Sequence, residues 1–398
     1  MSHQSITTDR QLQQFCRQLS GCRTIAFDTE FVSEHTYRPV LCLVQVEADG
    51  QLALIDALTV GEMTPLWEAL AAPGHQTIVH AGRGEVEFGL QAVGRPPADL
   101  IDVQIASGLA GLEYPAGFGT LLVRLVGQSH GKEETRTDWR RRPLSGRQIE
   151  YALDDVRYLP AMSKALETRI DGLGRTAWLA EEMADWQEQV CRTFAEERWR
   201  RVSGNSGLSP RSLAILREIW RWREAQAQRR DCPPRRVLRD DLMVELARRQ
   251  TAKEKRIRAV RGLDRGDLQR QLPKIAECIQ RALDLPEKDL PRAAQRSRMP
   301  QLALLGQFLY SALGTICRRA QLAPALVGTP SDVRELIAYR TGLSDHQKPP
   351  PLARGWRAEF IGRLFDDLLA GRASIRIADP LSDHPLVIEP VPDAGPDG

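Results

Sequence analysis

Short apolar segments alternate with helix-like segments along the first 175 residues of the chain. Residues 24–28, 41–46, 52–56, 77–80 and 100–103 have the composition of buried strands, and helix-like sequence follows the last three. Only the turn around Asp49 separates the second segment from the third, so we expect these two strands to pair antiparallel. The other strands are joined through helices. The pattern therefore predicts an α/β layer built on a mixed sheet.

Strand-like segments disappear after residue 175. Residues 176–207 are expected to form a connecting helix and linker, since they end in the flexible stretch Ser203-Gly204-Asn205-Ser206-Gly207. Residues 208–288 and 296–374 show helical periodicity of apolar residues, which predicts two all-α domains. Residues 378–398 are rich in Pro, Asp and Gly, a composition typical of a disordered tail.

Charge is unevenly distributed along the chain, although the formal net charge is only +3. Residues 1–190 carry a net charge of −9, residues 191–300 carry +13, and the remainder carries −1. An acidic first part and a basic middle are expected if the former holds multivalent metal ions and the latter binds a polyanion. A basic surface that serves only solubility is the alternative.

Several classes of protein are excluded by simple features. There is no run of 18 apolar residues, and the polar start of the chain lacks the apolar core of a secretory signal. The seven cysteines include no C-x-x-C pair, so neither a zinc site nor a disulfide framework is indicated. These features predict a protein of the reduced cytoplasm that does not act at a membrane.

Two carboxylates lie at the end of the first predicted strand, in Asp28-Thr29-Glu30. Side chains alternate along a strand, so Asp28 and Glu30 point to the same face. Neighbouring carboxylates repel one another, and a Mg²⁺ or Mn²⁺ ion relieves the repulsion because hard cations prefer oxygen ligands. An isolated D-x-E is also common at a solvated strand end, so this tripeptide alone does not decide the function.

Two further positions carry groups suited to the same chemistry. Tyr151 and Asp155 are four residues apart on the helix predicted after residue 146, so both point in one direction. His80-Ala81-Gly82 lies between a strand and a helix, and Glu85 falls in the first turn of that helix, where the dipole favours a carboxylate. A surface hydrogen-bonding pair and a simple helix-start acid are the structural alternatives.

Taken in order, these residues match the pattern of the DEDD 3′→5′ exonucleases of the tyrosine subclass, and the surrounding sequence resembles the ribonuclease D family. The helical remainder resembles the HRDC (helicase and RNase D C-terminal) domains of that family in position and length. The resemblance implies a ribonuclease-H-like mixed-sheet exonuclease domain in residues 1–175, followed by two all-α HRDC-type domains. The resembling segments are Phe27-Asp28-Thr29-Glu30-Phe31-Val32, His80-Ala81-Gly82, Ile101-Asp102-Val103-Gln104, Arg136-Thr137-Asp138-Trp139, Arg142-Pro143-Leu144 and Tyr151-Ala152-x-x-Asp155-Val156-x-Tyr158-Leu159.

The same resemblance implies a function and a set of roles. The expected protein is a monomeric 3′→5′ exoribonuclease that trims tRNA precursors and other structured RNAs with accessible 3′ ends. Two-metal-ion hydrolysis would release 5′-mononucleotides. Asp28, Glu30, Glu85 and Asp155 would hold two Mg²⁺ or Mn²⁺ ions, and Tyr151 would position the attacking water.

Glu85 departs from the family pattern, which has Asp at this position. The side chain of Glu85 is one methylene longer, so it would reach a metal ion after a shift of the backbone or a change of rotamer. Alternatively, it would bind the second ion only weakly. Two alternatives follow: a catalytically weakened RNA-binding protein, and a DNA 3′→5′ exonuclease of the same superfamily.

Four residues near the predicted site are expected to contact RNA. Phe31 is placed to stack on the terminal base, although core packing explains it equally well. A hydrogen-bonding core histidine is the alternative for His80, and an ion pair with Asp138 is the alternative for Arg136. Trp139 completes this set. Further along the chain, phosphates would contact a cluster of arginines that includes Arg221, Arg223, Arg229, Arg230, Arg235 and Arg236.

Overall fold

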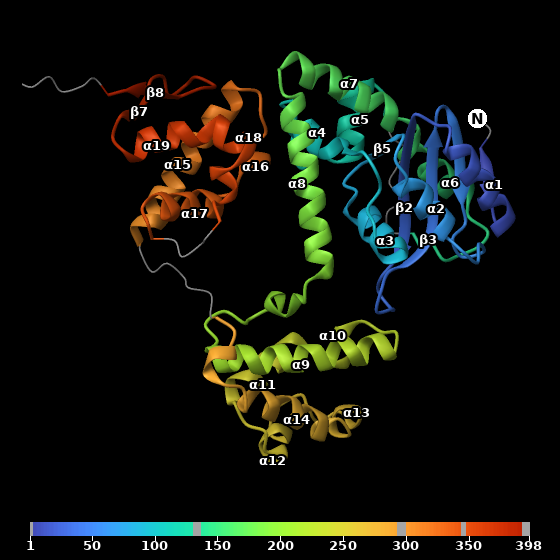
Figure 1. Cartoon of the computed structure of the whole chain (residues 1–398), viewed down its shortest axis with the longest axis vertical. Coiled ribbons are helices and arrows are strands. Elements are labelled where there is room, and N and C mark those ends of the chain that lie inside the picture. The colour runs from blue at the N-terminus through green and yellow to red at the C-terminus, as the bar shows by residue number, and fades with distance from the viewer. Residues whose placement is uncertain (1–2, 130–136, 293–299, 344–347, 392–398) are drawn as a thin grey trace, which may run out of the picture.

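The computed structural model describes residues 3–129, 137–292, 300–343 and 348–391. It contains an N-terminal α/β domain and two helical domains (Figure 1). The long helix α8 (Thr176–Ala195) runs between the N-terminal domain and the second helical domain and leads to the first helical domain. Within the described residues, no helix has both the length and the apolar character needed to cross a membrane.

The N-terminal domain is built on a six-stranded sheet with the order β1-β4-β3-β2-β5-β6. The pairs β2–β3 and β3–β4 are antiparallel, whereas β1–β4, β2–β5 and β5–β6 are parallel. The predicted mixed sheet and its antiparallel hairpin are therefore confirmed. The strands are β1 (Gln4–Ile6), β2 (Thr24–Val32), β3 (Val40–Ala48), β4 (Gln51–Ile55), β5 (Gln76–Val79) and β6 (Leu100–Asp102).

Helices cover both faces of this sheet, and α6 packs on β2, β3 and β4. Helix α6 starts with a capping box in which Ser145 and Gln148 satisfy each other's backbone N–H groups. It ends at Arg157, and α7 follows with Pro160 in its first turn, where a missing N–H does no harm. The helices are α1 (Asp9–Leu19), α2 (Thr64–Ala71), α3 (Arg83–Val93), α4 (Val103–Leu109), α5 (Phe118–Val126), α6 (Gly146–Arg157) and α7 (Leu159–Gly172).

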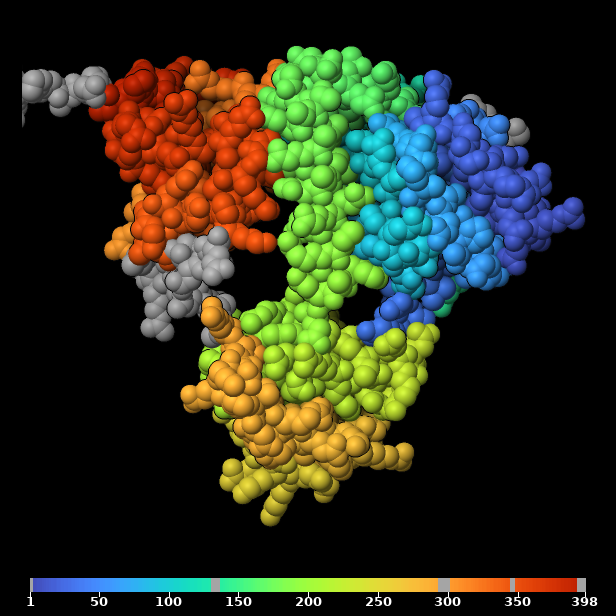
Figure 2. Space-filling model, in the orientation of Figure 1, coloured from blue at the N-terminus to red at the C-terminus, as the bar shows by residue number. Residues whose placement is uncertain are grey.

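The first helical domain has a hydrophobic core of its own, which includes Leu216, Met243 and Ile279. Helix α9 packs against both α11 and α14. Figure 2 shows this domain meeting the lower end of the N-terminal domain. Its elements are η1 (Arg198–Arg201), α9 (Pro210–Arg229), α10 (Pro234–Val237), α11 (Asp240–Arg249), α12 (Glu254–Arg258), α13 (Gly266–Gln269), α14 (Leu272–Leu283) and η2 (Glu287–Asp289).

The second helical domain shares one continuous cluster of buried apolar residues with the N-terminal domain. Helices α4 and α8 of the N-terminal half contact its helices α16 and α18. Its elements are α15 (Pro300–Arg319), α16 (Pro324–Val327), α17 (Pro330–Arg340), η3 (Pro351–Ala353), α18 (Gly355–Arg357), η4 (Ala358–Gly362), α19 (Arg363–Leu369), β7 (Ala373–Ile377) and β8 (Leu386–Pro390).

Part of the tail that the sequence predicts to be disordered is ordered. Strand β8, Leu386–Pro390, pairs antiparallel with β7. Leu386 and Ile388 line a cavity together with residues of α15, and Arg376 pairs with Glu389 across the two strands. The prediction for residues 378–398 is thus wrong for this segment, because its short apolar run is hidden in a composition dominated by Pro, Asp and Gly.

Candidate active site

Three acidic side chains from two elements meet on the face of the sheet that α6 covers. Asp28 and Glu30 lie on β2, and Asp155 lies in α6. Each offers a carboxylate oxygen, and these oxygens all lie within 4.8 Å of one another. The structure thus brings together three of the four metal ligands that the sequence predicts, from positions far apart in the chain.

Burial and mutual repulsion make this cluster hard to ionise. Desolvation is the main cause that raises the pKa of Asp28 well above its usual range, and the charges of Glu85, Asp155 and Glu30 add to it. Desolvation and the charge of Asp155 raise the pKa of Glu30 to about 8. A divalent cation offsets this repulsion, and carboxylate oxygens are the ligands that Mg²⁺ and Mn²⁺ prefer. The donor set therefore fits hard divalent cations.

Glu85 is buried in the first turn of α3, beside this cluster but not within it. The Thr29 hydroxyl donates a hydrogen bond of 2.6 Å to Glu85 Oε1. Thr29 points away from the face that carries Asp28 and Glu30, because side chains alternate along β2. Burial raises the pKa of Glu85 to about 7, although the Thr29 hydrogen bond opposes the shift. Thr29 is a site residue that the sequence reasoning missed.

Tyr151 belongs to the same face and hydrogen-bonds to Asp155. Burial, together with the charges of Asp155 and Glu30, raises the pKa of the Tyr151 phenol, so it remains protonated at neutral pH. Its ring packs against Trp139 with centroids 6.2 Å apart. Trp139 is only 2% exposed. The prediction that Trp139 contacts RNA is therefore wrong, because its indole is enclosed by protein and supports Tyr151.

Arg142 fixes the segment that carries Trp139. Its guanidinium donates to both carboxylate oxygens of Asp56, at 2.5 and 2.7 Å, and to the backbone oxygens of Trp139 and Cys42 at 2.7 and 2.9 Å. The resemblance pointed to Arg142-Pro143-Leu144 without giving it a role. In the structure, Arg142 holds the backbone at Trp139 and Cys42, and thereby supports the contact between Trp139 and Tyr151.

The other predicted RNA contacts have different surroundings. Phe31 is 41% exposed and makes an edge-to-face contact with Phe88, so its ring is accessible to a ligand. His80 Nε2 lies 2.9 Å from the Ala116 carbonyl oxygen, and its ring packs against Phe118. These contacts favour the hydrogen-bonding alternative for His80. Arg136 lies outside the described residues, and its proposed partner Asp138 pairs with Arg140.

Asp102 holds the turn that precedes α3. Its carboxylate accepts hydrogen bonds of 2.9 Å from the backbone N–H groups of Ala81 and Gly82. The turn is tight: Ala81 has a φ of +54°, and a Cβ at Gly82 would lie 2.3 Å from a methyl group of Val79. Asp102 therefore directs the start of α3, and with it Glu85, toward β2.

Much of the predicted arginine cluster is engaged within the protein. Arg223 is buried and pairs with Asp240 at 2.6 Å. Arg221 pairs with Glu197 and Glu218. Arg223 is therefore part of the domain interior, whereas Arg221, Arg229 and Arg230 are exposed.

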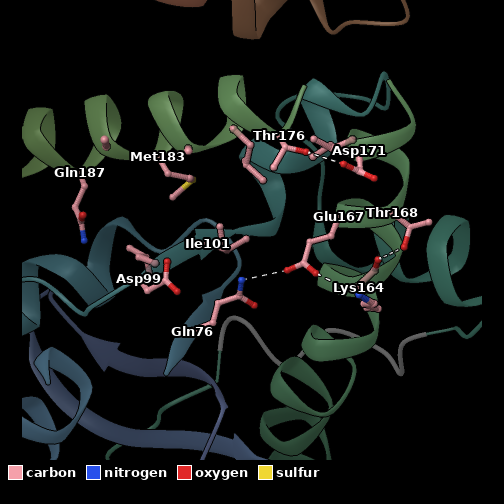
Figure 3. Close-up of a pocket in the computed structure, with 15 residues that line it drawn as sticks. Gln76, Asp99, Ile101, Lys164, Glu167, Thr168, Asp171, Thr176, Met183 and Gln187 are labelled. Atoms are coloured by element: carbon pink, nitrogen blue, oxygen red, sulfur yellow. Dashed lines mark hydrogen bonds and ion pairs between the residues drawn. The ribbon is translucent and has the colours of Figure 1, made fainter. Parts of the chain in front are cut away.

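A cavity of about 710 Å³ lies away from the carboxylates, between the β5–β6 edge and helices α7 and α8 (Figure 3). Two polar pairs line it: Gln76 donates to Glu167, and Thr176 donates to Asp171. A smaller cavity of about 520 Å³ lies next to the site, since Phe31 and Gly84 line it. Trp220 and Pro234 of the first helical domain form its opposite side.

Comparison with known proteins agrees with this geometry. The 3′–5′ exonuclease domain family matches residues 3–171, and the HRDC domain family matches residues 212–279. Ribonuclease D of Granulibacter bethesdensis is 32% identical over 364 residues, which cover 90% of this chain and 90% of that protein. Ribonuclease D of Acidiphilium cryptum is 33% identical and covers 93% of this chain and 94% of its own length.

A solved structure extends the similarity to the whole architecture. The crystal structure of Escherichia coli RNase D, described as an exoribonuclease involved in structured RNA processing, superposes with a TM-score of 0.81 at 28% identity. The match covers 93% of this chain and 99% of the E. coli chain. All three domains therefore share their arrangement with that protein.

Proposed function

The chain belongs to the ribonuclease D family of 3′→5′ exoribonucleases, and we propose that it trims the 3′ ends of tRNA precursors and other structured RNAs. The observation that carries the proposal is the convergence of Asp28, Glu30 and Asp155 within 4.8 Å, with the Tyr151 hydroxyl beside them. The alternative of a DNA exonuclease has no structural observation in its favour.

The residues divide into metal ligands and a group that positions water. Asp28, Glu30, Glu85 and Asp155 would hold two Mg²⁺ or Mn²⁺ ions, which when bound would activate a water and stabilise negative charge on the leaving oxygen. The Tyr151 hydroxyl orients the attacking water without deprotonating it, because a phenol with a raised pKa stays protonated at neutral pH and is a poor base.

In this proposal Glu85 takes the place of the usual Asp, although it also accepts a hydrogen bond from the Thr29 hydroxyl on the other face of β2. The bond engages Oε1 and fixes the carboxyl group, which leaves Oε2 for an ion. The charge of Glu85 also raises the pKa of Asp28, which indicates that the two groups lie close together. We therefore propose that the longer side chain of Glu85 serves as a metal ligand in place of the usual Asp.

Substrate binding follows from the surfaces around the site. The exposed ring of Phe31 stacks on the terminal base, and the neighbouring 520 Å³ cavity leads toward the first helical domain. The net positive charge of residues 191–300 attracts the RNA phosphates. The protein acts in the cytoplasm as a monomer and releases 5′-mononucleotides.

A cleavage assay tests the proposal. Purified protein is mixed with a 3′-extended tRNA and Mn²⁺ or Mg²⁺, alongside Asp28→Asn, Glu85→Asp and a DNA oligomer of matched sequence. We expect stepwise release of 5′-mononucleotides from the RNA, none from Asp28→Asn, and no gain in Glu85→Asp. Activity that appears only in Glu85→Asp would identify the natural chain as a weakened RNA-binding protein. Faster cleavage of the DNA would favour the DNA exonuclease.

A further inference from the structure

In the described part of the chain, the side-chain amide of one sheet residue is completely buried and makes no hydrogen bond. Gln45 lies on β3, a central strand, and its side chain is 0% exposed. Among the residues that the structure describes, neither its Oε1 nor its Nε2 has a hydrogen-bond partner. Buried polar groups in folded proteins nearly always have partners, because an unpaired amide loses its bonds to water and gains nothing in return. The missing partner of Gln45 therefore requires an explanation.

The strand register places Gln45 beside the metal-binding carboxylates. Gln45 pairs with Asp28 across the antiparallel strands β2 and β3. Residues directly opposite each other point to the same face, with Cβ atoms about 4.5–5.5 Å apart. A glutamine amide is therefore within reach of the Asp28 carboxylate by a change of rotamer.

The neighbours of Gln45 on the side away from Asp28 are apolar. On its other side it pairs with Leu54 of β4, which packs under α6 with Ala152 and Leu153. These side chains neither donate nor accept hydrogen bonds. Glu47 lies two residues further along β3. Its Oε1 accepts a 2.6 Å hydrogen bond from the Gly50 N–H, whereas its buried Oε2 has no partner among the described residues either.

We propose that Gln45 is a positioning residue for the metal site: its amide N–H donates to the Asp28 carboxylate when divalent cations are bound. The inference rests on the proposed function, since it assigns Asp28 to a metal ion. Groups that hydrogen-bond to a ligating carboxylate fix its orientation, and their loss weakens metal binding about 10- to 100-fold. In the metal-free protein the same amide contributes no hydrogen bond to stability.

Replacing Gln45 by an apolar residue of similar shape tests its role in metal binding separately from its role in the stability of the metal-free protein. In Gln45→Met and Gln45→Leu, we expect the metal-free melting temperature to be unchanged or higher, because no hydrogen bond is lost. We expect the Mn²⁺ dissociation constant, measured by calorimetric titration without RNA, to rise about tenfold or more. Thr77→Val is the matched control. Thr77 is also fully buried and its hydroxyl has no partner, but it pairs with Ile25, which faces the other side of β2 from Asp28.

Each outcome decides the proposal. Weaker Mn²⁺ binding with an unchanged or higher melting temperature, and no change in Thr77→Val, supports it. Unchanged Mn²⁺ affinity in both Gln45 variants overturns it. A lower metal-free melting temperature in both variants also overturns it, because the amide would then serve the fold, for example through Glu47. If the parent protein binds no Mn²⁺, the proposed function itself fails, which distinguishes that result from a failure of this inference.

Discussion

The two helical domains are predicted alike from the sequence, yet they attach to the N-terminal domain in opposite ways. The first domain has a separate core, and polar contacts join it to the N-terminal domain, including a hydrogen bond between Tyr37 and the partly buried Glu224. Arg198 pairs with Glu87 at 3.3 Å, and Asp231 accepts a 3.1 Å hydrogen bond from the backbone N–H of Tyr37. Exposed contacts of this kind contribute little to stability.

The second domain is fused to the N-terminal domain through buried groups. Trp356 is 2% exposed and stacks on Trp178 of α8 with centroids 5.3 Å apart. Glu182 of α8 accepts hydrogen bonds from Trp356 Nε1 at 2.8 Å and from Arg357 at 2.5 Å. Arg175 donates to the backbone oxygens of Leu109 and Gln321, both at 2.7 Å.

The difference indicates that the second domain and the nuclease domain form one cooperative unit, while the first domain is a separate one. The catalytic carboxylates belong to the larger unit. The first domain contacts the loop that follows β2, which carries on from Glu30 and Phe31. Thermal unfolding should therefore show two transitions.

Among the variants that test this difference, Trp356→Ala is expected to change the unfolding free energy most. The variant removes a fully packed indole and the hydrogen bond to Glu182, so the larger unit should lose about 3–5 kcal/mol of unfolding free energy. Calorimetry should show a lower transition for the nuclease unit and an unchanged transition for the first domain. A shift of both transitions together would show that the three domains unfold as one.

Ile279→Ala is the converse test in the first domain. Ile279 is 0% exposed in the separate core, and its truncation should cost about 2–4 kcal/mol. Only the first-domain transition should fall, and cleavage of a short single-stranded oligomer should continue. Loss of stability in the nuclease unit would contradict the separation of the cores.

Mn²⁺ should stabilise only the nuclease unit, by about 2.7 kcal/mol at a hundred times the dissociation constant. The raised pKa values of Asp28 and Glu30 mean that the metal-free folded state holds protons that the unfolded state releases. Metal-free stability should therefore fall as the pH rises from the usual carboxyl pKa of 4.5 through the folded value of about 8 for Glu30.

The stabilisation by Mn²⁺ should accordingly be greater at about pH 8.5 than at about pH 6, where protons compete for the carboxylates. Differential scanning fluorimetry with and without Mn²⁺ measures this dependence, and Asp28→Asn is the control. A Mn²⁺ effect that is independent of pH, or that appears in the first-domain transition, would place the ion elsewhere.

Asp231→Ala is expected to have the smallest effect. It removes the acceptor for the Tyr37 N–H at the contact between the nuclease and first helical domains. Both unfolding transitions should change by less than about 1 kcal/mol. Asp231→Asn retains an acceptor and should match the parent. A larger loss would show that this contact is more than a weak polar junction.

The sequence predicts the mixed sheet, the β3–β4 hairpin and the break near Pro160, because each depends on local patterning. It also predicts the convergence of Asp28, Glu30 and Asp155, but only through the family resemblance, since no local rule relates a strand to a helix so far along the chain. The strand β8 is missed because its pairing with β7 outweighs the composition around it.

Other parts of the site depend on tertiary contacts that the sequence does not show. Trp139 was assigned to RNA from its place in a motif, but packing under Tyr151 and the anchoring by Arg142 bury it. Thr29 appears in the sequence only as the residue between Asp28 and Glu30, and its hydrogen bond to Glu85 depends on the tertiary fold. Gln45 lies in a segment predicted only as a strand, and its place opposite Asp28 depends on the strand register. The exposed ring of Phe31, in contrast, is compatible with the predicted contact to RNA.

The most direct test of the account is the location of Mn²⁺ in crystals of the full chain, determined from its anomalous scattering. We predict a peak bounded by the carboxylate oxygens of Asp28, Glu30 and Asp155, and a second peak next to Glu85. The absence of a peak at the three carboxylates, with Mn²⁺ bound at another place, would contradict the account.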